Sequence, residues 1–331
     1  MGDVAMLVPV LKAFREANPD VEVTILTRAF FQAFFRDIEG LRFFSPDFGG
    51  RHKGLAGLGR LARDLAPFGI THVADLHDVL RTKLLRRLLG HKVQKTAVID
   101  KGRAEKRALT RKHRKLRKQL KTTVERYRET LLRAGFECPL PVSVERMPRP
   151  VPEEIAQLAG AKEQPWIGVA PFAQHRGKIY PLPLMTEAIG ELAAMGKVFI
   201  FGGGDYEKEY AEAMEKMFPG VVSVIGKIRL AAEINLISNL DVKVTMDSAA
   251  MHMASLVGVP VVSVWGATHP FAGFYGFGQD PDDAVQLDLD CRPCSVYGNK
   301  ECMWGDWRCL ERIPPTAVAG RVAAVLAKSA V

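Results

Sequence analysis

Short apolar runs rich in β-branched residues alternate along the chain with amphipathic segments of helical period. Strands that alternate with helices predict right-handed crossovers and a parallel sheet covered by helices on both faces. The pattern therefore predicts an α/β fold. The expected strands are residues 21–27, 71–76, 93–99, 166–171, 198–202, 221–225, 242–246 and 261–265, and two clear expected helices are 6–17 and 231–238.

The alternation is interrupted at residues 138–155, where several prolines occur without periodicity. Such a stretch is typical of a linker. A chain of 331 residues is also long for a single domain. We therefore predict two α/β domains, one over residues 1–150 and one over residues 151–331.

The chain opens directly on a helical pattern, "MGDVAMLVPVLKAF", although the alternation predicts a strand before this helix. We interpret this as a missing first strand, and we expect the true beginning to lie upstream of Met1.

Composition and charge narrow the class of protein. Apolar residues make up 47% and charged residues 25% of the chain, which is typical of globular proteins. No stretch approaches the roughly 20 apolar residues of a membrane-spanning helix, and no secretory leader is visible, so we expect a cytoplasmic protein. The net charge of +9 predicts an acidic partner: a phosphorylated substrate, an anionic membrane surface or nucleic acid.

Much of the positive charge lies in residues 101–128. Apolar residues recur there at steps of three, four and seven, from Leu109 through Leu116 and Leu120 to Leu131, which predicts one long helix with an apolar face. Its lysines and arginines then form either a solvated face or a surface that contributes to acceptor or membrane binding. Because the run lacks interleaved aromatic residues, nucleic acid is the least favoured partner.

Asp247, Ser248 and His252 stand where an apolar strand is expected to pass into a helix. Asp and Ser are good helix caps, and capping alone explains them. The same backbone amides, with the positive end of the helix dipole, also form a phosphate site. Capping does not explain His252, although a satisfied buried histidine is an alternative.

Two further strand exits in the second domain carry polar residues. One delivers Gln174 and Lys178, and the other delivers Glu207 after three glycines. In doubly wound folds, ligands bind at the carboxyl edge of the sheet. Cations for phosphates, a carboxylate for ribose hydroxyls and a helix N-terminus together predict a nucleoside-diphosphate site.

Several segments resemble glycosyltransferase family 9, the ADP-heptose:lipopolysaccharide heptosyltransferases. They are the N-terminal "GDVAMLVPVLKAFREANPDVEVTILT", "KIYPL" at Lys178, "MDSAAMHMASLVGVPVVSVWGAT" and the cysteine-rich tail, and they occur in the correct order over nearly the whole chain. The resemblance implies the GT-B architecture: two Rossmann-like, doubly wound parallel-sheet domains that face each other across a cleft, acceptor in the N-terminal half and donor in the C-terminal half. For this architecture we also consider a last helix that packs back toward the N-terminal domain. The resemblance further implies transfer with inversion, from an ADP-heptose donor, without a metal or other cofactor.

The resemblance also implies roles for individual residues. Asp3, in the N-terminal "GD", matches the proposed general base, and Lys178 matches the lysine that contacts the donor phosphates and sugar. Glu207 falls where a carboxylate holds the ribose, and Ile228 falls where the adenine packs. The remaining donor-site candidates are Asp247, Ser248, Ala249 and His252, which match an Asp-Thr-Gly-x-x-His segment, and Gln174 in the loop before the lysine.

The chain departs from the family pattern at these same places. Ser248 and Ala249 replace Thr and Gly, so a hydroxyl is kept but the most permissive backbone position is lost. Phe172, Ala173 and Gln174 replace the threonines that precede the lysine. The phosphate site stays plausible on these grounds, and the donor sugar stays open. Without the resemblance, Asp3 is equally well explained as a helix N-cap.

Arg81 and Lys83 are the candidate acceptor-binding residues, in a helical pattern that follows a polar strand exit. With part of the 101–128 run, they are expected to hold phosphates or carboxylates of a lipid-linked core saccharide. The same positive charge predicts peripheral contact with the cytoplasmic face of the inner membrane.

Four of the five cysteines lie close together near the C-terminus, spaced as Cys291-x2-Cys294-x7-Cys302-x6-Cys309. The first pair is zinc-like, but the second pair is too widely spaced for a standard zinc ribbon. We favour reduced thiols and keep a structural metal as the alternative.

The sequence thus predicts an inverting glycosyltransferase that moves a heptose, or a related sugar, from an ADP-activated donor to a phosphorylated, lipid-linked acceptor of the lipopolysaccharide core. Two alternatives stay open. One is another nucleotide-sugar enzyme of the same fold, such as a UDP-dependent transferase or an epimerase. The other is a non-catalytic basic protein that binds anions or nucleic acid.

Overall fold

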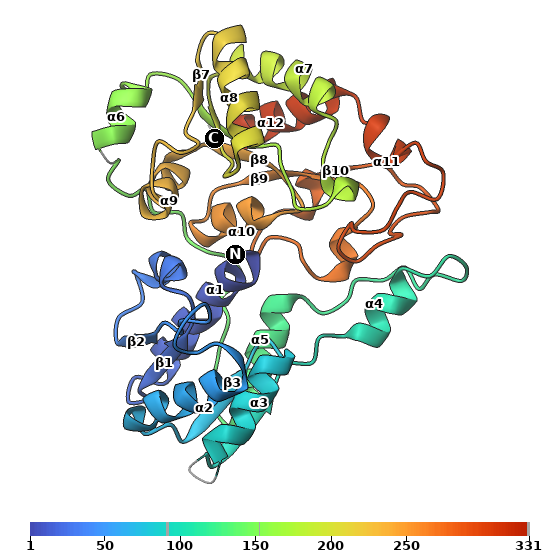
Figure 1. The fold of residues 1–331 in the computed structure, drawn as a ribbon. Coiled ribbons are helices and arrows are strands. Elements are labelled where there is room, and N and C mark those ends of the chain that lie inside the picture. Colours follow the sequence, from blue (N-terminus) through green and yellow to red (C-terminus); the bar gives the residue numbers. More distant parts are fainter. Residues whose placement is uncertain (91–92, 152, 330–331) are drawn as a thin grey trace. The chain divides into compact units, whose positions relative to one another are not determined.

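The computed structural model describes residues 1–90, 93–151 and 153–329, which form two compact units (Figure 1). The first unit holds Asp3–Gly102 and Thr123–Pro141. The second unit holds Arg103–Thr122 and the chain from Val142 onward. We call residues 103–122, which belong to the second unit, the basic arm.

The first unit contains two pairs of parallel strands. β1 (Val23–Leu26) pairs with β2 (Leu41–Phe44), and β3 (His72–Asp75) pairs with β4 (Lys95–Val98). Among the residues described, the two pairs are not joined by a further hydrogen-bonded strand. The helices of this unit are α1 (Gly2–Ala17), α2 (Gly54–Leu65), α3 (Leu80–Leu89) and α5 (Thr123–Ala134), with the short 3-10 helices η1 (Ala29–Phe35) and η2 (Ala66–Phe68).

The second unit is built on one six-stranded sheet in which every pair of neighbouring strands is parallel, in the order β10-β9-β8-β5-β6-β7. The chain runs outward from β5 to β7 on one side and from β8 to β10 on the other. The direction therefore switches between β5 and β8, the position at which doubly wound sheets bind ligands. The strands are β5 (Trp166–Ala170), β6 (Lys197–Ile200), β7 (Val221–Ser223), β8 (Val242–Met246), β9 (Val261–Trp265) and β10 (Ala284–Gln286).

Helices cover both faces of this sheet (Figure 1). On one face, α7 (Leu182–Ala193) and α12 (Pro315–Ser329) pack on the apolar core that includes Val244 and Val264. On the other face, α10 (Ala249–Leu256) packs on β8 and β9 and against α9 (Leu230–Asn239). Side chains alternate between the faces of a strand, so Lys243 and Thr245 lie on this second face, both completely buried. The remaining elements are α4 (Arg103–Leu109), α6 (Glu153–Ala159), α8 (Asp205–Met217), α11 (Arg308–Glu311), η4 (Arg176–Lys178), η5 (Pro270–Ala272) and η6 (Pro281–Asp283).

All eight predicted strands are present, and β8 and β9 agree with the prediction at both ends. Every residue of those two strands is buried, which explains why an uninterrupted apolar run located them. The sequence did not indicate β2 or β10, which have four and three residues.

The prediction of one long helix over the basic run is wrong. α4 ends at Leu109 and α5 begins at Thr123, and the residues between them are irregular. Leu109 and Leu120 pack on Ala272 of the second unit, in a small core of their own, whereas Leu116 is 51% exposed. The spacing of apolar residues satisfied a helical period, but their partners lie far away in the sequence.

None of the helices in the described part of the chain is both long and apolar enough to cross a membrane.

Candidate functional site

The candidate site lies where β5 and β8 end side by side. These neighbouring strands are parallel, with Ala170 opposite Thr245, so the segments that follow them leave the same edge of the sheet. The loop after β5 leads through η4 to Lys178, and β8 leads to Asp247. The ammonium of Lys178 lies 2.9 Å from Oδ2 of Asp247. The switch point of the sheet therefore carries a largely buried ion pair, with side chains 15% and 4% exposed.

Helix α10 begins at this ion pair. Its N-cap is Ser248, and Asp247 precedes the cap rather than serving as it. The Ser248 hydroxyl makes no capping hydrogen bond. Oγ of Ser248 and Nδ1 of His252, four residues apart at the start of α10, are both buried without a hydrogen-bond partner among the described residues. Oγ1 of Thr245, near the end of β8, is likewise unpaired there. Each such atom costs about 1–3 kcal/mol if it stays unpaired, so this cluster is chemically suited to contact a polar ligand at the positive end of α10.

His252 is held neutral. Burial, reinforced by the charge of Lys178, lowers the pKa of His252 to about 3. The side chain is 6% exposed, and a neutral imidazole adds no second positive charge beside the ammonium. Lys178 therefore supplies the cationic group of this cluster, and His252 offers only hydrogen bonds.

Two glycines give Lys178 its position. Gly298 has a φ of +75°, and a Cβ at this position would lie 2.6 Å from Cγ of Lys178. The amide of Gly177 donates to the carbonyl of Gly298 over 3.3 Å, and the carbonyl of Gly177 accepts from the amide of Ala267 over 2.8 Å. The loop after β9, through Ala267, and the cysteine-rich tail, through Gly298, thus both form main-chain hydrogen bonds with η4. No sequence motif indicated a role for Gly298, because that role depends on contacts between distant segments.

Glu207 lies in the first turn of α8, as predicted. Its Oε2 accepts from the amides of Gly203, at 2.6 Å, and Gly204, at 3.4 Å. This carboxylate therefore caps its own helix through one oxygen, in the manner of a capping box. Ile228 is half-buried in the bend between β7 and α9, Gln174 is exposed in the loop after β5, and Ala249 is the first residue of α10. Their predicted roles stay predictions.

Asp3 lies in the first unit, in the first turn of α1, where it is exposed. The N-cap of this helix is Met1, so Asp3 is not the cap. The Tyr127 hydroxyl donates to the main-chain carbonyl of Asp3 over 3.2 Å, and burial, together with the Asp3 charge, raises the pKa of Tyr127. Tyr127 therefore fixes the first turn of α1 and leaves the Asp3 carboxylate at the surface.

The acceptor candidates already have partners within the first unit. The Arg81 guanidinium lies 3.8 Å from the centre of the Phe48 ring, and the Lys83 ammonium lies 3.8 Å from Asp78. Arg86, which the sequence did not single out, contacts Asp75 at 3.1 Å and Asp78 at 3.6 Å. The acceptor role of Arg81 and Lys83 stays a prediction.

Within the described residues, the cysteines do not form a group with the geometry of a metal centre. All five thiols are free, and no group of three or more His, Cys, Asp or Glu side chains in the described ranges is arranged to hold a metal ion. The structural metal proposed as an alternative for Cys291, Cys294, Cys302 and Cys309 therefore gains no support from the geometry.

The switch point of this doubly wound sheet carries a lysine, a helix N-terminus and unpaired hydroxyls. Together these groups are suited to bind a diphosphate. Residues 58–304 match the family model for glycosyltransferase family 9 (heptosyltransferase). The chain belongs to glycosyltransferase family 9. It is thus a glycosyltransferase, and the resemblance read from the sequence is confirmed.

Solved structures agree with the family 9 assignment. A family 9 glycosyltransferase from Veillonella parvula is 18% identical, with a TM-score of 0.74 over 99% of this chain and 94% of that one. ADP-heptose lps heptosyltransferase II of E. coli is 18% identical, with a TM-score of 0.69 over 100% and 97% of the two chains. E. coli heptosyltransferase WaaC with ADP is 19% identical, with a TM-score of 0.67 over 98% and 96%. The fold is therefore α/β of the GT-B type, as predicted. No curated protein matches this sequence.

Proposed function

We propose that this family 9 enzyme transfers a heptose, or a closely related sugar, from an ADP-activated donor to a saccharide of the lipopolysaccharide core. The ion pair between Lys178 and Asp247, beside the unpaired Ser248 hydroxyl at the start of α10, is the observation that carries the proposal. The similar E. coli structures, which carry heptosyltransferase names and in one case ADP, support the choice of donor.

The proposed chemistry assigns each group one task. The ammonium of Lys178 and the amides at the start of α10 stabilise the departing ADP diphosphate. Asp3 accepts the proton of the acceptor hydroxyl as the hydroxyl oxygen forms its bond to the anomeric carbon. The bond from that carbon to the diphosphate breaks in the same step, so the configuration inverts. Glu207 holds the ribose through the oxygen that does not cap α8, and Ile228 packs on the adenine.

The donor is tested by titrating purified protein with ADP, UDP and GDP and measuring binding by calorimetry. ADP is expected to bind most tightly. A clear preference for UDP would replace this proposal with a UDP-dependent transferase of the same fold, and failure of all three to bind would reject a nucleoside-diphosphate donor. A transfer assay with ADP-heptose and a lipopolysaccharide core acceptor, run with and without EDTA, then tests the reaction and its independence of metal.

The proposal extends to the place of action, the cytoplasmic face of the inner membrane. Arg111, Lys112 and Arg114 of the basic arm are exposed, and clustered cations bind anionic lipid headgroups. Co-sedimentation with vesicles of anionic phospholipid tests this proposal. Binding should be lost at high salt and absent with vesicles of neutral lipid.

A further inference from the structure

A cavity opens in the second unit, at the ends of β9 and β10. It has a volume of about 390 Å³, within the usual range for small-molecule sites. Gln286, the last residue of β10, and His269 and Phe271, which follow β9, line it together with Arg117 of the basic arm and Arg292. The residues that line this cavity differ from the donor-site residues, so it is a separate site on the same unit.

Residues 266–268, which follow β9, form hydrogen bonds both to the donor site and to the cavity. The amide of Ala267 donates to the carbonyl of Gly177, next to Lys178, over 2.8 Å. The Arg292 guanidinium donates to the carbonyl of Gly266 and, over 3.0 Å, to that of Thr268. The same short segment therefore supports the loop that carries Lys178, through Ala267, and accepts hydrogen bonds from the guanidinium of Arg292.

The positive charge of Arg292 is buried, and no carboxylate of the described residues is paired with it, although the charge of Asp288 acts on it. The side chain is 2% exposed. Its hydrogen-bond partners are neutral oxygens, the main-chain carbonyls of Gly266, Leu287 and Thr268 and the side-chain amide of Gln286, and it forms no ion pair within the described ranges. Burial lowers the pKa of Arg292 to about 10, so the group stays charged near neutral pH. A buried charge of this kind favours an anion nearby.

Arg117 and His269 are two further donors in the lining, and Arg117 already has carboxylate partners in Asp288 and, at 4.0 Å, Asp290. His269 Nδ1 accepts from the amide of Phe271 over 3.1 Å, so a neutral His269 carries its proton on Nε2, where it can donate to a ligand. Burial and the charges of Arg292 and Arg117 lower the pKa of His269 to about 4. The carboxylate that does line the cavity, Asp288, is exposed and lies 3.3 Å from Arg117.

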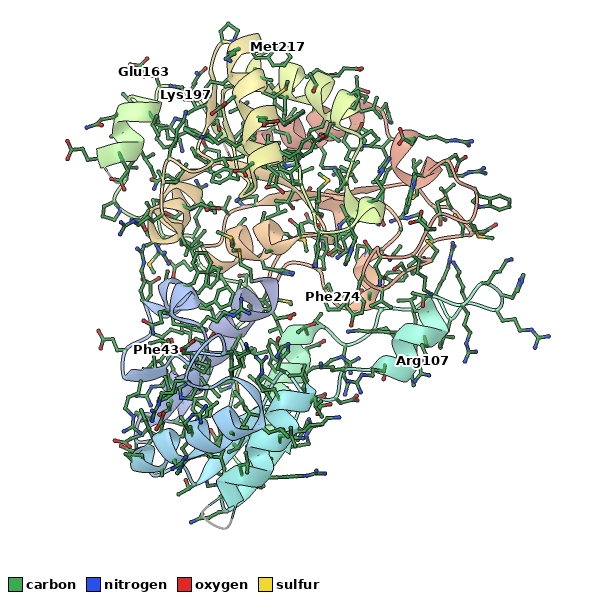
Figure 2. The ribbon with its side chains drawn as sticks, viewed as in Figure 1. Phe43, Arg107, Glu163, Lys197, Met217 and Phe274 are labelled. Carbon is green, nitrogen blue, oxygen red and sulfur yellow. The ribbon has the colours of Figure 1, made fainter. Side chains whose placement is uncertain are left out.

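The basic arm contributes Arg117 to the lining of this cavity and is bound to the segments beside it. Lys115 donates to the carbonyls of Cys291 and, over 3.0 Å, Pro293, and the amide of Leu120 donates to the carbonyl of Phe271 over 2.9 Å. Arg117 donates to the carbonyl of Arg292 over 3.1 Å. Nearby, the Lys106 ammonium of α4 lies 4.1 Å from the centre of the Phe274 ring; Figure 2 labels Phe274 and, on α4, Arg107.

We propose that this cavity binds an anionic sugar unit, with its carboxylate or phosphate near Arg117 and Arg292 and its ring against Phe271. The two guanidiniums and the His269 donor match the anionic group, while Phe271, Leu287 and Pro293 supply apolar surface for the ring. Resting on the proposed function, the sugar unit belongs to the acceptor saccharide, and the basic arm contributes to its recognition through Arg117.

The test uses Arg117→Gln in the full-length protein. Arg117 is 35% exposed, so the variant is expected to fold, whereas Arg292 holds three carbonyls together and is a poor choice. Lys118→Gln is the matched control, because it removes the same charge from the neighbouring, exposed position. Glucuronate and glucose 6-phosphate serve as probes, with glucose as the neutral reference, and binding is followed by saturation-transfer NMR and calorimetry.

Both anionic probes are expected to bind more tightly than glucose, and Arg117→Gln should weaken them about fivefold to tenfold, as for loss of one charge-assisted hydrogen bond in a partly exposed site. Lys118→Gln should change little. The proposal is overturned if neither anion binds better than glucose, or if both variants weaken binding equally. ADP affinity is measured in the same samples: its absence would reject the donor assignment, while the preference for anionic sugars would still decide the cavity.

Discussion

The ammonium of Lys178 lies 2.9 Å from the carboxylate of Asp247, although 68 residues of chain separate the two. The sheet order explains the contact, because β5 and β8 are neighbouring parallel strands and the segments that follow them leave the same carboxyl edge of the sheet. Asp247 fixes the lysine side chain at the start of α10. A diphosphate bound there would meet an ammonium already in position, so little side-chain entropy would be lost on binding.

Lys178→Ala should weaken ADP binding about tenfold to a hundredfold, since a hydrogen bond to a charged group contributes about 1.5–3 kcal/mol. Calorimetric titration with ADP measures the change. Arg176→Ala is the control: this residue lies in the same η4 turn, but its guanidinium is 2.7 Å from Glu311. Equal losses in the two variants would show that the loop was disturbed and would remove the specific role of Lys178.

Asp3→Asn should lower turnover about a hundredfold to ten-thousandfold, the usual contribution of a general base, while the affinity for ADP is retained. The amide keeps the size of the side chain and loses its basicity, and the contact of Tyr127 with the main chain of Asp3 is unaffected. Steady-state assays of transfer give the turnover number. Asp20→Asn, at an exposed position beyond the end of α1, should behave as the unchanged protein. Near-normal turnover of Asp3→Asn would reject this residue as the base.

The strands of the second unit could be predicted because burial shaped their composition. In β8 and β9 both faces are covered, so the apolar runs have sharp ends at Met246 and Trp265. Lys243 lies within one of these runs, but a single lysine did not hide the pattern. The short strand β10 escaped notice because its three residues are only partly buried.

The donor-site residues could be predicted as a set, since the residue types at helix starts and strand ends indicate ligand binding. The contacts that these residues make with other segments could not be predicted. Nothing in the spacing shows that Lys178 meets Asp247, that Gly298 must lack a side chain, or that Tyr127 holds Asp3. The prediction of a long helix over the basic arm failed for the same reason. The contacts of Lys115 and Leu120 with residues 271–293 determine the path of the arm, and local periodicity carries no information about these contacts.

Lys243→Met should stabilise the protein. The lysine is completely buried and its Nζ has no hydrogen-bond partner among the described residues; the Phe201 ring, 3.9 Å away, gives partial compensation. Burial lowers the pKa of Lys243 to about 8 against the opposing charge of Glu233. Replacing a buried charge together with its partner is often worth about 1–4 kcal/mol, so the gain is expected to be largest when Glu233 is neutralised as well.

Thermal unfolding measures the effect of Lys243→Met, which should raise the midpoint without changing ADP affinity. Glu233, whose pKa burial raises, is the charged group that acts on Lys243, so Lys243→Met is also compared with Lys243→Met/Glu233→Gln. A lower midpoint in both variants would mean that the lysine stabilises the sheet, contrary to the prediction.

His252→Gln should flatten the dependence of stability on acid pH. The folded-state pKa of His252 is about 3, below its ordinary value of 6.5, so between these values the unfolded chain binds a proton that the folded chain does not. The stabilisation from neutral His252 is therefore complete above about pH 6.5 and is lost as the pH falls toward 3, by up to about 1.4 kcal/mol per pH unit.

Unfolding midpoints measured from pH 7 to pH 4, in buffers without phosphate, should fall faster for the unchanged protein than for the His252→Gln variant, so that the difference between the two midpoints narrows. His269, whose pKa is also lowered by burial, is present in both proteins and cancels in the comparison. Parallel curves would show that His252 titrates alike in the folded and unfolded chains and that it is not held neutral beside Lys178.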